Sequence, residues 1–137
     1  MRHRFVILSR TLIACGMLAA ASSLPLGGAA FAHHSGTMFD RTHPIAVVGT
    51  LTDFRWANPH SWITMAVPDG KGGTDTWTLE GGSVTFMVRN GWSRTSILNG
   101  DKIRAIVAPR RDNTDGGEFM SVKNLRTGIT YQQNGHF

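Results

Sequence analysis

A succession of short β-type segments, interrupted by one helical segment, constrains the fold of this chain more than any other feature. Each segment is rich in β-branched and aromatic residues, and polar turns containing Gly, Asp or Asn separate the segments. The segments are residues 45–56, 62–67, 76–80, 102–108, 119–125 and 129–131. The sequence therefore predicts an all-β protein.

A single short helix is expected between the third and fourth β segments. Ser83 suits the N-cap position, and Val84, Met87 and Val88 follow at the i, i+3, i+4 spacing of one apolar stripe. The Asn90-Gly91 pair can end the helix with a left-handed residue. We expect this helix to pack one face on the β structure.

The order of the elements favours a five-stranded OB-like barrel, with one short helix, over residues 45–137. Gly49 lies inside the first segment and indicates a bulge or a sharp bend. A bent first strand suits such a barrel, because that strand pairs at two edges of the closure. The alternative is a small β-sandwich, but that fold usually has about seven strands and no interior helix.

Residues 1–32 have the order of a secretory signal peptide. A basic start is followed by an apolar run and by Ala30-Phe31-Ala32, a small-x-small cleavage site. The run is interrupted by Ser22, Ser23 and Pro25, and it is short for a membrane span of ~20 residues. We expect cleavage after Ala32, a periplasmic or secreted product, and no membrane span in the mature chain.

Two other export signals fit less well. Leu12-Ile13-Ala14-Cys15 resembles a lipobox, but Arg10 interrupts the apolar run before the cysteine, and the best apolar stretch follows it. A twin-arginine signal fails because Thr11 follows Arg10. Cys15 is the only cysteine, so a processed chain has no disulfide and no thiolate chemistry.

The charge of the mature chain does not point to a nucleic-acid partner. The chain has 14 Lys plus Arg and 9 Asp plus Glu, and Arg2, Arg4 and Arg10 leave with the signal, so 11 basic and 9 acidic residues remain. Arg110-Arg111 is the only adjacent basic pair. Nucleic-acid-binding proteins usually cluster basic residues on one face. We expect no nucleic-acid partner.

Several short motifs carry a resemblance to a known family. They include His33-His34-Ser35, Asn58-Pro59-His60, Gly91-Trp92 and Gly100-Asp101. Together they resemble a family of small exported bacterial proteins that is known only as a domain of unknown function. The resemblance implies export and an OB-like barrel, and it implies no particular reaction.

A histidine site for copper or a similar ion is the first functional hypothesis. Cleavage after Ala32 would give His33 both an α-amine and a ring nitrogen, and His60 after the Asn58-Pro59 turn would add a second imidazole. Nitrogen-rich, tetragonal ligand sets favour Cu(II). We therefore predict metal ligands at His33, His34 and His60. Reserve ligands, which could take the place of one of these, are Met38, Asp40 and His43 in the polar N-terminal segment, residues 33–44.

Other interpretations of these histidines remain open. Cleavage after Ala30 would place His33 third in the mature chain, a position that also binds Cu(II). Histidines beside a cleavage site are often solvated, and a histidine after an Asn-Pro turn is often a hydrogen-bonded turn residue. Sequence spacing cannot decide between a metal site and these interpretations, because only the fold can bring His33 and His60 together.

A metal-free ligand face is the second hypothesis. OB barrels bind oligosaccharides and single strands through stacked aromatic rings. The candidates here are Trp56, Trp62, Glu80 and Trp92, although we expect at least two of the four tryptophans to belong to the core. The ligand would be a sugar or a small apolar molecule.

Catalytic motifs are missing from the sequence: it contains no G-x-S-x-G and no H-E-x-x-H pattern. We therefore expect an exported binding or accessory protein that acts on an unidentified small ligand or an exported protein partner, with copper as its candidate ion. The alternatives are a copper-dependent oxidase that uses the same histidines and a metal-free binding or interaction module.

Overall fold

Six strands and two short helices follow one another in residues 35–133, which are the residues described by the computed structural model. The elements are α1 (Ser35–Met38), β1 (Ile45–Arg55), β2 (Trp62–Pro68), β3 (Thr74–Glu80), α2 (Val84–Arg89), β4 (Lys102–Pro109), β5 (Gly116–Asn124) and β6 (Thr130–Gln132). The expected signal peptide, His33 and His34 lie outside the described residues. Helix α1 is one turn that the sequence did not predict.

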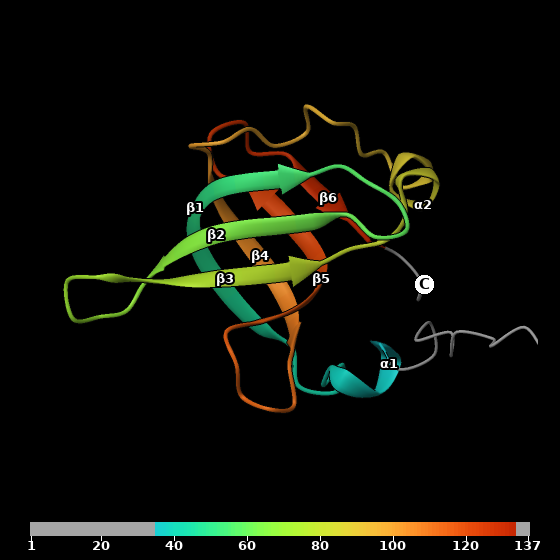
Figure 1. The fold of residues 1–137 in the computed structure, drawn as a ribbon. Helices are drawn as coiled ribbons and strands as arrows, with labels where there is room; N and C mark the ends of the chain where they lie inside the picture. The colour runs from blue at the N-terminus through green and yellow to red at the C-terminus, as the bar shows by residue number, and fades with distance from the viewer. Residues whose placement is uncertain (1–34, 134–137) are drawn as a thin grey trace, which may run out of the picture. The chain divides into compact units, whose positions relative to one another are not determined.

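The strands close into a barrel, as the sequence predicted. Hydrogen bonding joins them in the order β3-β2-β1-β4-β5-β6, and a parallel pairing of β3 with β5 closes the ring of the first five strands. Figure 1 shows α2 in the connection between β3 and β4. This is the strand order of an OB barrel, and the sandwich alternative is excluded. Strand β6 is an additional strand paired with β5.

Strand β1 serves two neighbours, and Figure 1 shows it bending strongly along its length. Its first half pairs with β4 and its second half with β2, and Thr50 is a partner of both Ala66 and Lys102. The register shift lies between Leu51 and Asp53, just beyond Gly49. Gly49 has another role: a Cβ there would lie 2.5 Å from the Ala66 carbonyl oxygen.

Replacing Gly49 tests this close approach. We expect Gly49→Ala to lower the free energy of unfolding by about 1–3 kcal/mol, because the added methyl group forces β1 away from β2. The control Thr76→Ala changes one exposed residue of β3, and surface substitutions usually stay within ~0.5 kcal/mol. Urea unfolding measures both, and equal stabilities of the two variants would contradict the packing argument.

The barrel interior is filled by alternate residues of the strands. Its members are apolar and almost fully buried: Val47, Leu51, Ile63, Met65, Leu79, Ile103, Ala105, Val107, Phe119 and Val122. Helix α2 begins after the expected N-cap Ser83, whose side chain accepts a hydrogen bond from the Phe86 backbone. Only Met87 of the predicted stripe is buried, and Val88 is 55% exposed. Trp92, just beyond this six-residue helix, belongs to the same core cluster as Met87.

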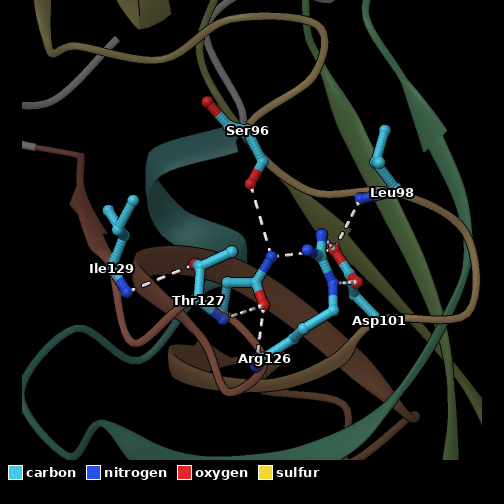
Figure 2. Close-up of polar contacts among 7 residues, drawn as sticks. Ser96, Leu98, Asp101, Arg126, Thr127 and Ile129 are labelled. Carbon is cyan, nitrogen blue, oxygen red and sulfur yellow. Dashed lines mark hydrogen bonds and ion pairs between the residues drawn. The ribbon is translucent and has the colours of Figure 1, made fainter.

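The Gly100-Asp101 motif holds a turn against the β5–β6 connection (Figure 2). One carboxylate oxygen of Asp101 accepts from the Arg126 Nε at 2.6 Å, and the other accepts from the Asn124 amide at 2.7 Å and the Leu98 backbone at 2.9 Å. Gly100 has a φ of 90°, which favours glycine. The Arg126 hydrogen bond is the main reason that the pKa of Asp101 falls to about 2. We assign this motif a structural role.

Acid should weaken the fold through Asp101. Since its pKa falls from 3.8 to about 2 on folding, its stabilisation is complete above about pH 4 and is lost as the pH falls toward about 2. We expect Asp101→Ala to cost about 2–4 kcal/mol at neutral pH, because it removes a buried, hydrogen-bonded charge. Urea unfolding across this pH range should show that the difference in free energy of unfolding between Asp101→Ala and the native chain becomes smaller in acid.

The exposed Asp75 provides the control for this titration. Asp75→Ala should stay within ~0.5 kcal/mol of the native chain. If Asp101→Ala lowers the free energy of unfolding as much near pH 2 as at neutral pH, the contacts assigned to Asp101 are contradicted.

Candidate functional site

Closure of the barrel brings two glutamates side by side. Glu80 ends β3 and Glu118 lies near the start of β5, and they are direct partners in the parallel pairing. Strand β5 begins with Gly116-Gly117, and a Cβ on Gly117 would overlap the carbonyl oxygen of Ala108. These glycines therefore allow β5 to approach its neighbours closely enough to align the two carboxylates.

Glu118 is neutralised by an arginine from the N-terminal segment. The Nε of Arg41 lies 2.6 Å from a carboxylate oxygen of Glu118, whose side chain is only 4% exposed. Phe39 is buried and forms an isolated β-bridge with Arg110. The backbone of Asp40 donates to the Pro109 carbonyl at 2.8 Å. The N-terminal segment is thus bound to the end of β4, and this contact positions Arg41.

Glu80 is paired with His60. The His60 Nδ1 lies 2.9 Å from a Glu80 carboxylate oxygen and 3.2 Å from the Gly81 carbonyl oxygen. Backbone hydrogen bonds from Ser61 to Gly82 and from Gly81 to Ser61 continue the β2–β3 pairing up to this turn. The Asn58-Pro59 peptide bond before His60 is cis. The histidine is therefore held by both its backbone and its ring.

The contacts of His60 determine which ring nitrogen carries the proton. The Gly81 carbonyl can only accept a hydrogen bond, so its contact places the proton on Nδ1. In this tautomer the free lone pair is on Nε2. Histidines that bind metals have this arrangement, because a carboxylate or carbonyl group orients the ring through its other nitrogen.

The pKa of Glu80 is raised above its usual value. Burial is the main reason that the pKa of Glu80 rises, and the neighbouring Glu118 carboxylate raises it further. His60, Arg110 and Arg41 act in the opposite direction by favouring the charged carboxylate. The Glu80 side chain is 12% exposed and the His60 side chain 30%. The pair therefore lies at the edge of the solvent.

Comparison with known proteins places the chain in a family. The sequence model of a family of unknown function (DUF6152) matches residues 21–119, which is most of the chain. The chain belongs to this family. Neither curated proteins nor solved structures give a match. The resemblance carried by the motifs is confirmed, and the family name states no activity for the DUF6152 protein.

Two of the three reserve ligands, Asp40 and His43, contact each other. The Asp40 carboxylate lies 3.0 Å from the His43 Nδ1, and the His43 side chain is 83% exposed. Hydrogen bonds from Thr42, and then from His43, lower the pKa of Asp40. Met38 is exposed on α1. Within residues 35–133, no three His, Cys, Asp or Glu side chains gather in a metal-binding group.

The tryptophans of the DUF6152 barrel occupy different environments. Trp92 is 2% exposed, and its indole N–H donates to the Gln132 carbonyl at 2.9 Å, so it belongs to the core. Trp56 is partly exposed and packs edge-to-face on Phe54 at 5.5 Å. Trp62 is also partly exposed. Of the expected ligand face, Trp56, Trp62 and Glu80 keep some solvent contact, whereas Trp92 does not.

Sequence reasoning missed Glu118 and Arg41. No local motif pairs these carboxylates, because Glu80 and Glu118 are brought together only by the parallel pairing of β3 and β5. The Gly81-Gly82 pair follows one acid and Gly116-Gly117 precedes the other. In a predicted OB barrel these two strands close the ring, so an acid next to a glycine pair on each of them could have indicated that Glu80 and Glu118 are neighbours.

No helix in residues 35–133 is long and apolar enough to cross a membrane.

Proposed function

We propose that this protein is an exported binding or accessory protein for copper or a similar ion. In this proposal His60 is a ligand through Nε2, His33 and His34 are the further ligands, and Glu80 orients the His60 ring. The observation that carries the proposal is the contact of the His60 Nδ1 with both Glu80 and the Gly81 carbonyl.

The His60 contacts support the proposal because they prepare the ring for a ligand. A carboxylate partner raises the basicity of the opposite ring nitrogen and reduces the freedom of the ring. Glu80 lies in a largely buried position, where screening by water is weak and its effect on the ring is stronger.

The course of the N-terminal segment gives a second line of support. Arg41 contacts Glu118, and Glu118 is the strand partner of Glu80. His34 lies seven positions before Arg41, a stretch that spans at most ~25 Å when fully extended. A site that combines His60 with the N-terminal histidines is compatible with this connection.

Processing of the leader would complete the ligand set. Cleavage after Ala32 would give His33 a free α-amine beside its imidazole, and with His34 and His60 the ion would have four nitrogen ligands. Such a set suits Cu(II) and excludes hard ions that prefer oxygen. Cleavage after Ala30 would instead make His33 the third residue, with backbone amides as ligands.

Titration with Cu(II) tests the proposal on protein purified after export, with its N-terminus determined by mass spectrometry. We expect His60→Ala to weaken binding by about tenfold or more, because one imidazole ligand is lost. We expect Glu80→Gln to weaken it by about tenfold, as is usual when a partner of a metal-bound histidine is changed. Protein that retains its leader should bind more weakly, because the α-amine of His33 is absent.

The exposed His43 provides a matched control. His43→Ala removes a histidine that also contacts a carboxylate, and we expect it to leave the affinity within about twofold. If His60→Ala behaves like His43→Ala, His60 is not a ligand. If the native protein binds no more tightly than an isolated exposed histidine, the copper site is absent and a metal-free binding module becomes the better account.

Oxygen consumption separates the accessory protein from a copper-dependent oxidase. With Cu(II) bound and ascorbate as the reductant, we expect the protein to suppress the turnover shown by free copper. Turnover above that of free copper that is lost in His60→Ala would instead identify an oxidase at the same histidines.

A further inference from the structure

A second site lies at the end of the barrel where β4 ends and β5 begins. An open pocket of about 460 Å³ is present there, within the ~300–1,000 Å³ that is usual for ligand sites. Its wall contains Trp77 of β3, Asp40 of the N-terminal segment, and Arg110, Arg111, Asn113 and Asp115 of the β4–β5 loop. Ile45 and Pro109 add apolar surface.

The side chains of this pocket select a class of ligand. Two arginines face two aspartates, so the wall has donors and acceptors but no excess of one charge. That balance disfavours a strongly anionic ligand and suits a neutral molecule with many hydroxyl groups. The indole of Trp77 offers an apolar surface for the C–H face of a sugar ring, in the way that aromatic side chains bind saccharides in OB barrels.

The loop that forms the wall is held in place before any ligand arrives. The Asp112 carboxylate accepts from both the backbone and the hydroxyl of Thr114, at 3.0 and 2.7 Å. The Arg111 backbone donates to the Met38 carbonyl at 2.9 Å, which joins the loop to α1. The Arg110 backbone donates to Gly116 at 3.2 Å. Preorganisation of this kind lowers the entropy cost of binding.

We propose that this pocket binds a neutral oligosaccharide. One sugar ring packs on Trp77, Arg111 and Asn113 donate hydrogen bonds to ring hydroxyls, and Asp115 accepts one. The pocket wall contains neither His60 nor Glu80, and the proposal does not depend on copper binding. Loss of copper binding in His60→Ala therefore leaves saccharide binding unchanged, and the two proposals fail separately.

Nuclear magnetic resonance tests this assignment through the indole N–H signals. The chain has four tryptophans, and Trp77→Phe identifies the Trp77 signal. The probes are the tetramer of N-acetylglucosamine and cellotetraose. We expect at least one of them to shift the Trp77 signal in a saturable way, with a Kd of about 1 mM or below. The Trp92 signal should not move, because its ring is buried and its N–H donates to Gln132.

Variants of the wall then locate the bound sugar. Arg111→Ala removes a donor from an exposed side chain, so the fold should persist, and we expect binding to weaken by about tenfold. Arg89→Ala on α2 is the matched control and should leave binding unchanged, because Arg89 is exposed and lies outside the pocket wall. An undisturbed Trp92 signal in each variant confirms that the core is intact.

Three results would overturn the proposal. The first is an unmoved Trp77 signal with both oligosaccharides at ~10 mM, which is well above the expected Kd. The second is equal binding by Arg111→Ala and Arg89→Ala. The third is a Trp77 shift that inorganic phosphate or citrate produces and that neither sugar produces, which would make the pocket an anion site.

Discussion

The parallel pairing of β3 with β5 is the contact on which the candidate metal site depends. It closes the barrel and places Glu80 directly beside Glu118. Two carboxylates so close, both with little solvent, repel one another unless cations or protons compensate. Arg41 supplies a cation at Glu118, and the Nδ1–H of His60 contacts the carboxylate of Glu80. The N-terminal segment and the Asn58-Pro59-His60 turn are therefore held to the barrel through the electrostatics of its closure.

The same end of the molecule links the two proposed sites. Arg110 lines the pocket and also favours the charged form of Glu80. Asp40 lines the pocket and also holds His43. The N-terminal segment thus contributes to the pocket wall through Asp40 and contacts the closing acids through Arg41. These two sets of contacts give a physical reason why the N-terminal segment packs against the barrel although it has few apolar residues.

Much of the fold could be predicted from local patterns. Strand β1 begins at Ile45 as expected, the N-cap Ser83 starts α2, and the helix interrupts the strands where the OB order requires it. These features depend on residues near one another in the sequence. Val88 was wrongly expected in the buried stripe, because only Met87 of the short helix α2 enters the core, beside Trp92 in the same cluster.

The candidate site was less predictable because it depends on distant residues. His60 and Glu80 were each singled out, but nothing in their local sequence indicated a contact across the β2–β3 pairing. Glu118 and Arg41 were missed for the same reason. The Gly100-Asp101 motif helped to identify the family and has a structural role in the described residues. Ligation by His33 and His34 stays a prediction, since both lie outside the described residues.

The most direct test of the account is a crystal structure of the exported, processed protein with Cu(II), in which anomalous scattering locates the ion. The account predicts a copper peak at the bond length of an imidazole ligand, about 2.0–2.1 Å, from the His60 Nε2, with Nδ1 still on Glu80 and Gly81. Copper held only by the N-terminal residues, or bound through Nδ1 after His60 has left Glu80, would contradict it.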